Sequence, residues 1–342
     1  MAVISFKPKQ VTKRLLSNLQ DRAHDIIVHR YGLSENADSK TLEAIGKKYS
    51  ITRERVRQIE NAALAAIRKS ESFRTEHKVF SELRAMIEGL GAMVHEDEFL
   101  THLSKDKAIQ NHLRFYLVLS DEFEKLKEDD HFQTRWTVDQ ELSQVVHDAL
   151  HSVYRSLSDK ELLNEEDLIA RFLEELKGVA EQYKNEEIAR RWLNISKKIG
   201  KNPLGEWGPA SSQNIKTRGI KDYAFLMMRK HGSPMHFREV AKAIADTFGR
   251  KTHVATTHNE LIKDPRFVLV GRGYYALTEW GYKPGVVRDV IGEILKKDGP
   301  LSKEEVVDRV LKERFLKKNT ILVNLQNAKY FKKLDDGRYT TV

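Results

Sequence analysis

Cysteine is absent from the 342 residues of the chain. This absence excludes disulfide bonds, thiolate zinc sites and a cysteine nucleophile, and it is consistent with a reducing compartment. Long apolar runs are also missing, because no stretch approaches the roughly 18 apolar residues that a membrane-spanning helix needs. The first ten residues, MAVISFKPKQ, lack the apolar segment of a secretory signal. We therefore expect a cytoplasmic protein without membrane contact.

Groups of residues that suggest catalysis or metal binding are also scarce. His253 and His258 are five residues apart, which places them on different faces of a helix, and no third ligand lies nearby. Gly271-Arg272-Gly273 lacks the third glycine of a phosphate loop and falls between two expected strands. His95-Glu96-Asp97-Glu98 falls at an expected helix start, where acidic side chains favour the helix dipole. We predict a protein that is not an enzyme, with no catalytic residues, metal, cofactor or small-molecule substrate.

Negative charge is low at both ends of the chain. The formal net charge is +9 and the pI is near 9.3. Residues 1–78 hold 16 Lys and Arg against 9 Asp and Glu, and residues 216–342 hold 26 against 15, whereas residues 79–215 hold 17 against 26. The basic ends suit the phosphate backbone of DNA. The acidic middle suits protein contacts better, although it is equally consistent with an ordinary solvated surface.

The segment 41–68, TLEAIGKKYSITRERVRQIENAALAAIR, has the pattern of a helix-turn-helix. A turn is expected at Ser50 and Ile51, and the hydroxyl of Thr52 is placed to cap the helix that follows. Both helices have one apolar face at helical spacing. These faces consist of Leu42, Ile45 and Tyr49 in the first helix and of Val56, Ile59, Ala63 and Ile67 in the second.

The exposed side of the second helix carries groups that hydrogen-bond to bases. In a helix-turn-helix the first residues of this helix reach base edges in the major groove. Arginine pairs with guanine, glutamine pairs with adenine, and glutamate accepts from cytosine. We predict base contacts by Arg53, Glu54, Arg57 and Gln58, and phosphate contacts by Lys47, Lys48, Thr52 and Arg55. The alternative is a solvated helix face.

This string resembles region 4 of the bacterial sigma-70 family, most closely in RERVRQIE at residues 53–60. The preceding segment 23–33, AHDIIVHRYGL, is similar to region 4.1, and Gly32 suits the left-handed conformation that ends a helix. The resemblance implies a module that reads the promoter minus-35 element and docks on the flap of RNA polymerase. A complete sigma-70 factor also has a region 2, which captures the melted strand. We recognise no such segment, so we expect a sigma-like accessory protein that does not open promoters alone.

The rest of the chain repeats a pattern of three helices followed by a β-hairpin with aromatic residues. Such repeats indicate a string of small domains. Wing aromatics are expected at Trp136, Trp207, Trp280 and Tyr339. The expected organisation is a helix-turn-helix module at 1–75, followed by winged-helix units at 79–138, 145–210, 220–282 and 286–342. Generic helices with core aromatics remain the alternative, above all for the two units in the acidic middle, where a single helical bundle is equally open. The fold class is therefore mainly α with small wings.

The unit at 220–282 resembles the HARE-HTH domain, through HGSPMHFREVAKAI and DPRFVLVGRGYYALTEWG. That domain occurs in the delta subunit of bacterial RNA polymerase, where it serves the polymerase, and in chromatin and restriction proteins, where it is proposed to bind DNA. The ligand implied for this unit is therefore open between DNA and polymerase. A second basic surface is predicted from Arg238, Lys242, Arg250, Lys251 and Arg272.

We expect a nucleoid-associated, DNA-binding transcription protein that resembles a sigma factor. Its expected partners are double-stranded promoter DNA and the core of bacterial RNA polymerase, and its expected role is in transcription initiation. One alternative is a DNA-binding regulator, or a restriction- or chromatin-linked reader, that is independent of polymerase. A second alternative is a protein-interaction scaffold.

Overall fold

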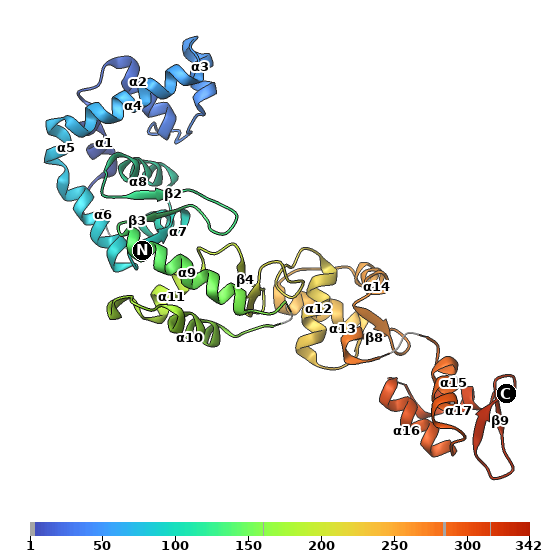
Figure 1. Cartoon of the computed structure of the whole chain (residues 1–342). Helices are drawn as coiled ribbons and strands as arrows, with labels where there is room; N and C mark the ends of the chain where they lie inside the picture. The colour runs from blue at the N-terminus through green and yellow to red at the C-terminus, as the bar shows by residue number, and fades with distance from the viewer. Residues whose placement is uncertain (1–3, 160, 283–284, 315) are drawn as a thin grey trace. The chain divides into compact units, whose positions relative to one another are not determined.

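The computed structural model describes residues 4–159, 161–282, 285–314 and 316–342 (Figure 1). The chain divides into two compact units, one formed by residues 1–201 and 207–211 and the other by residues 202–206 and 212–342. Residues 1–3, 160 and 315, which fall within the expected modules, lie outside the described residues. Helices predominate and the sheets have two or three strands, so the expected mainly α class with helix-turn-helix and winged-helix units is confirmed.

The first unit begins with the helix-turn-helix. Its helices are α1 (Pro8–Leu16), α2 (Asp21–Tyr31), α3 (Leu42–Tyr49) and α4 (Arg53–Lys69). Gly32 ends α2 in the left-handed conformation, with a φ of 63°. A short helix, α5 (Glu71–Thr75), leads from α4 into the next module.

Two winged-helix modules complete the first unit. The first contains α6 (His77–Gly89), β1 (Met93–His95), α7 (Glu96–Leu103), α8 (Lys107–Leu119), β2 (Glu124–Leu126) and β3 (Arg135–Thr137). Its sheet is antiparallel, with the order β1-β3-β2. The second contains α9 (Gln140–Ser156), α10 (Glu165–Glu175), η1 (Glu181–Tyr183), α11 (Glu186–Leu193), β4 (Ile199–Lys201) and β5 (Trp207–Pro209). The acidic middle of the chain thus forms two winged modules.

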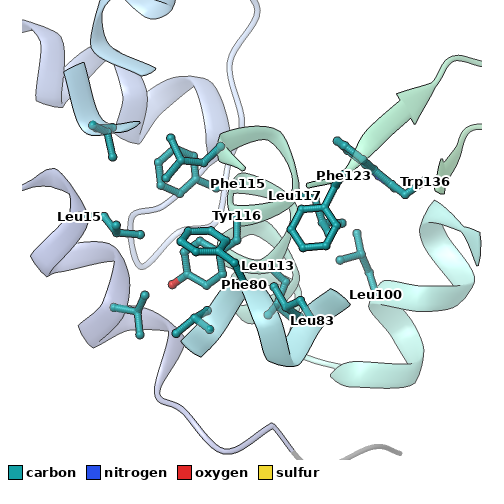
Figure 2. Close-up of a cluster of buried hydrophobic side chains, with 14 of the residues drawn as sticks. Leu15, Phe80, Leu83, Leu100, Leu113, Phe115, Tyr116, Leu117, Phe123 and Trp136 are labelled. Atoms are coloured by element: carbon teal, nitrogen blue, oxygen red, sulfur yellow. The ribbon is translucent and has the colours of Figure 1, made fainter. Parts of the chain in front are cut away.

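One hydrophobic core joins the helix-turn-helix to the first winged module. Phe115 and Tyr116 of α8 are fully buried, and Figure 2 shows them beside Leu15 of α1 and Phe80 of α6. The same core takes in Ile67 from the end of α4. The sequence predicts separate modules at residues 1–75 and 79–138, but their apolar side chains are removed from water together. This shared burial stabilises both modules.

Helix α8 is also held by hydrogen bonds to the helix-turn-helix. The amide of Asn111 donates to the carbonyls of Gly32 (3.1 Å) and Ala37 (2.9 Å), in the loop after α2. The hydroxyl of Tyr116 donates to the carbonyl of Pro8. The guanidinium of Arg68 donates to the carbonyl of Leu119 (2.7 Å), at the C-terminal end of α8. Buried polar groups that are paired in this way fix the position of α8 relative to the helix-turn-helix.

A cluster of polar side chains closes the wing of the first winged module. The indole of Trp136 on β3 donates to the carboxylate of Glu96, the first residue of α7, at 2.7 Å. Lys125, opposite Trp136 in the sheet, forms an ion pair with Glu96 at 2.7 Å and lies over the indole ring at 5.2 Å. Arg114 of the third helix completes the cluster with a 3.1 Å ion pair to Glu96.

The second winged module contains the same cluster in the same places. The indole of Trp207 on β5 donates to Glu165, the first residue of α10, at 3.3 Å. Lys201, opposite Trp207, forms an ion pair with Glu165 at 2.6 Å, and Arg190 of the third helix does so at 2.6 Å. These hydrogen bonds lower the pKa of Glu165 to about 2, with Lys201 as the largest cause and Arg190 next. The two modules therefore repeat the same side-chain chemistry, and an isolated bridge between Leu163 and Trp207 takes the place of the β1–β3 pairing in the second.

Two expectations from the sequence need correction here. Glu96 begins a helix as expected, but its role is not only to favour the helix dipole. Its carboxylate is buried, accepts a hydrogen bond from Trp136, and forms ion pairs with Lys125 and Arg114. Trp280 is not a wing residue, because it lies in η2 (Thr278–Trp280), after the wing. The position equivalent to Trp136 is occupied by Tyr275, which pairs with Met235 in the sheet of the third winged module.

The second unit contains two further winged modules. The third module has α12 (Ile220–His231), β6 (Met235–His236), α13 (Phe237–Phe248), α14 (Val254–Lys263), β7 (Phe267–Leu269) and β8 (Tyr274–Leu277). The fourth has α15 (Val287–Asp298), α16 (Lys303–Glu313), α17 (Lys318–Leu325), β9 (Phe331–Lys333) and β10 (Tyr339–Thr341). Both agree with the expected order of helices and hairpin. Among the described residues, no helix has the length and apolarity that a bilayer crossing requires.

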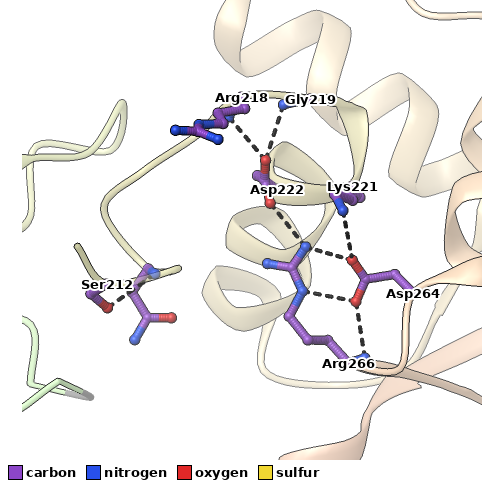
Figure 3. Close-up of polar contacts among 8 residues, drawn as sticks. Ser212, Arg218, Gly219, Lys221, Asp222, Asp264 and Arg266 are labelled. Carbon is purple, nitrogen blue, oxygen red and sulfur yellow. Dashed lines mark hydrogen bonds and ion pairs between the residues drawn. The ribbon is translucent and has the colours of Figure 1, made fainter. Parts of the chain in front are cut away.

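An ionic network fastens the start of α12 in the third module (Figure 3). The carboxylate of Asp222 accepts from the backbone amides of Arg218 (2.9 Å) and Gly219 (3.0 Å), which caps the helix. Arg266, just before β7, binds both Asp222 (2.9 Å) and Asp264 (2.7 Å). The wing strand is therefore tied to the first helix of its module.

We predict that Glu96→Gln lowers the free energy of unfolding by about 1–3 kcal/mol, because Trp136, Lys125 and Arg114 lose their shared charged partner. Burial, the largest influence, raises the pKa of Glu96, but the lysine, the indole and Arg114 together hold it below its usual value. The stabilisation is therefore present above the unfolded-state pKa and is lost as the pH falls through the folded one.

Denaturant unfolding at pH 7 and at lower pH measures both effects. Asp97→Asn is the matched control, because Asp97 is on the same helix turn and its side chain is 78% exposed. Equal losses of stability in the two variants would contradict the assigned role of Glu96.

Candidate nucleic-acid interface

The turn between α3 and α4 is fixed by hydroxyl caps and one left-handed residue. Thr41 begins α3 by accepting from the amide of Ala44 (3.2 Å), and Thr52 begins α4 by accepting from the amide of Arg55 (3.1 Å). Ser50 ends α3 with a φ of 54°. The predicted turn at Ser50 and the predicted cap at Thr52 are both present.

Gly46 lets the two helices approach each other at this turn. Its backbone lies against the carbonyl of Ile51, and a Cβ built on Gly46 would stand 2.6 Å from that oxygen. The amide of Ile51 donates to the carbonyl of Gly46 at 3.0 Å. A side chain at this position would push α3 away from α4, so the glycine helps to set the angle between them.

A small core supports the turn, and it is distinct from the core shared with α8. Ile26 of α2, Ile45 of α3 and Val56 of α4 are fully buried together. The later part of α4 places Ala63 and Ile67 in the shared core instead. Helix α4 therefore belongs to two cores, one behind its reading end and one at its far end.

The four predicted base readers lie on the first turns of α4, and their side chains are exposed. Arg57 forms an ion pair with Glu54, with a closest contact of 2.7 Å. The side-chain hydrogen bond from Arg57 lowers the pKa of Glu54. Gln58 accepts from Arg55 at 3.0 Å. Glu54, Arg57 and Gln58 thus each have a polar partner on their own helix.

The predicted phosphate contacts are less uniform. Lys47 is exposed and forms a surface pair with Glu43 at 3.1 Å. Lys48 is bound to Asp25 of α2 at 3.0 Å, so it also links α2 to α3. The hydroxyl of Thr52 accepts its cap bond and keeps its proton to donate.

A buried acidic residue that the sequence analysis missed positions α4. The hydroxyl of Tyr31 on α2 donates to the carboxylate of Glu60 on α4 at 2.9 Å, and Arg30 lies 3.4 Å from the same carboxylate. Burial, followed by the charge of Glu60, raises the pKa of Tyr31. The signal in the sequence is that Glu60 follows Val56 and Ile59 at helical spacing and so falls on the inner side of the helix.

The predicted second basic surface lies on the third winged module, and all five of its side chains are exposed. Arg238 and Lys242 are on α13, Arg250 and Lys251 are in the loop before α14, and Arg272 is in the wing turn. They come from the second helix, the loop after it and the wing turn rather than from the third helix. None of the five has an ion pair within the described ranges.

These features define a helix-turn-helix module of the DNA-binding type, followed by winged helices. Residues 15–69 match the family model for sigma-70 region 4, and residues 218–280 match the family model for HARE-HTH, a helix-turn-helix domain of restriction endonucleases and ASXL proteins. The chain therefore carries a sigma-70 region 4 domain and a HARE-HTH domain, as the resemblances in the sequence imply. Both are helix-turn-helix families rather than enzyme families.

Several curated sigma factors match a short stretch of the chain. The chain is 40% identical over 63 residues to the RNA polymerase sigma factor RpoD of Helicobacter pylori, which is 18% of this chain and 9% of that protein. It is 46% identical over 56 residues to RpoS of Coxiella burnetii, covering 16% of each. It is 48% identical over 54 residues to SigA1 of Synechococcus elongatus, covering 16% of this chain and 13% of that protein. The chain thus spans a small part of these sigma factors.

We predict that Thr52→Ala lowers the free energy of unfolding by about 1 kcal/mol, because the first turn of α4 loses its side-chain cap. Thr52→Ser keeps a hydroxyl in the same place and is the matched control. Thermal unfolding of the two variants and the parent chain measures the effect. Equal stability of the alanine and serine variants would show that the cap does not hold α4.

Proposed function

We propose that this protein is a sigma-like accessory factor in transcription initiation. Its region 4 domain reads a minus-35-type promoter element and docks on RNA polymerase. The observation that carries the proposal is the match of residues 15–69 to sigma-70 region 4, together with the exposure of Arg53, Glu54, Arg57 and Gln58 on the first turns of α4.

Base reading by this helix is an exchange of partners. Arg57 releases Glu54 and pairs with guanine, while Glu54 accepts from the amino group of cytosine. Gln58 releases Arg55 and pairs with adenine, and Arg55 turns to a phosphate. Exposed ion pairs such as Arg57–Glu54 contribute little to stability, so breaking this pair costs little free energy. Intrahelical pairing also keeps these long side chains ordered before DNA arrives.

The relatives are named as RNA polymerase sigma factors, which supports polymerase as a partner of this chain. The region 4 domain would hold the promoter and the polymerase flap together. The HARE-HTH domain, with its five exposed cations, adds a contact to DNA or to the polymerase. In this role the protein supplements a complete sigma factor.

Two alternatives follow from the same domains. A DNA-binding regulator without polymerase would use the same base readers, and the description of the HARE-HTH family names restriction endonucleases. A protein-interaction scaffold would use the winged modules for protein contacts. Pull-down with purified core polymerase separates the first alternative from the proposal, and loss of DNA binding on mutation of α4 argues against the second.

We predict that Arg57→Ala weakens binding to the selected DNA site by about 1–3 kcal/mol and relaxes the preference at one base pair. Selection from a randomised duplex pool, followed by anisotropy titration of the parent and variant chains, measures both quantities.

Arg74→Ala is the matched control, because it also removes one cation and one surface pair three residues apart, that with Glu71. The control should keep affinity and sequence preference. An unchanged affinity and preference in Arg57→Ala itself would exclude base reading by this residue.

A further inference from the structure

The fourth winged module contains a long basic segment without acidic residues. Residues 314–334 include Arg314, Lys317, Lys318, Lys329, Lys332 and Lys333 and no Asp or Glu. The segment lies outside both family matches, which cover residues 15–69 and 218–280. In the fold it forms the third helix, α17, and the first wing strand, β9. Third helix and wing are the parts of a winged helix that can enter and flank a DNA groove.

Helix α17 has one buried side and one exposed side. Ile321 and Leu325 are buried in the core of the module. Lys318, Asn319 and Thr320 are exposed, and Val323 is 62% exposed. The exposed side thus presents one cation, an amide, a hydroxyl and an apolar group. These groups match phosphates, base edges and the methyl group of thymine.

The acidic residues of this module lie elsewhere, and several are engaged with arginines. Asp289 is paired with Arg288, Asp298 with Arg309, and Asp336 with Arg338. By contrast, none of Lys317, Lys318, Lys332 and Lys333 has an ion pair within residues 285–314 and 316–342 or elsewhere in the described chain. Four uncompensated cations therefore remain on the third helix, on the residue before it and on the wing.

The third helices of the other modules differ from α17. Helix α8 is largely buried against the helix-turn-helix. On α11, Arg190 and Arg191 are held by Glu165 and Glu98. Helix α14 exposes Val254 and Ile262 and has no cation before Lys263. Among the third helices of the four winged modules, as far as the structure describes them, α17 alone is both accessible and basic.

We propose that α17 and β9 form a second site for duplex DNA, separate from the region 4 domain. Lys317, Lys318, Lys332 and Lys333 contact phosphates, and Asn319, Thr320 and Val323 face the groove. The site contributes mainly sequence-independent affinity, because most of its groups are cations. It does not depend on the proposed promoter reading, since it uses other residues and needs no polymerase.

The first test measures the salt dependence of binding to a duplex of arbitrary sequence. The full chain carries Arg57→Ala throughout, so that base reading by α4 does not contribute. Adding Lys317→Gln and Lys318→Gln should reduce the slope of log affinity against log salt by about 2, since each lost phosphate contact removes about 0.9.

The matched control is Lys296→Gln with Lys297→Gln, on exposed residues in the last turn of α15. It changes the net charge of the same module equally. A reduction of the slope by the α17 pair alone supports the site. Equal reductions, or none from the α17 pair, overturn it.

The second test uses the absence of cysteine, which makes any introduced thiol unique. A photo-crosslinker attached to Val323→Cys should couple to duplex DNA, while the same group on Leu311→Cys of α16, which is 42% exposed, should not. Stronger coupling of Val323→Cys to single-stranded RNA or to core polymerase than to duplex DNA would refute the proposal. Because neither test reads promoter sequence, either can fail while promoter reading by Arg57 succeeds.

Discussion

The burial of α8 is the constraint on which the rest of the first unit depends. In a free winged helix the third helix is available to a ligand. Here Phe115 and Tyr116 of that helix are in a core with α1 and α4, and Asn111 binds the loop after α2. The third helix of the first winged module is therefore part of a structural contact and is covered by the helix-turn-helix. The shared core and the hydrogen bonds of Asn111 hold the helix-turn-helix against this module.

The polar cluster of Glu, Lys, Arg and Trp joins the wing to the second and third helices in the first two winged modules. In these modules the wing lies over the start of the second helix. The first two modules place Glu96 and Glu165 there, under an indole and two cations. The third module has aromatic contacts there, with Phe237 stacked on His258 at 4.2 Å and the edge of His258 against Tyr275. One backbone arrangement is thus stabilised by charge in the acidic middle and by aromatic contacts after it.

The sequence predicts local features of this fold well, because they depend on short-range rules. The cap at Thr52, the left-handed Gly32 and the stripe containing Val56 and Ile67 follow from hydrogen bonding and helical period within one segment. The same holds for the exposure of Arg53 and Arg57, which face away from that stripe.

The tertiary contacts could not be predicted in this way. The partners of Glu96 come from three separate elements, and the bonds of Asn111 span more than 70 residues. Nothing local distinguishes a buried α8 from an exposed third helix, because an amphipathic pattern does not say which neighbour covers it. Glu60 is intermediate: helical spacing places it inside, but its partner Tyr31 is on another helix. The hydrogen bond between Glu60 and Tyr31 depends on how α2 packs against α4, which the sequence of either helix does not specify.

Helix α4 acts mechanically as a rod clamped near both ends. Its 17 residues extend for about 25 Å, at 1.5 Å per residue. Val56 anchors the end that carries the base readers, and Ile67 anchors the other end in the core shared with α8. Tilting of one end of α4 would therefore displace the side chains that pack around its other end.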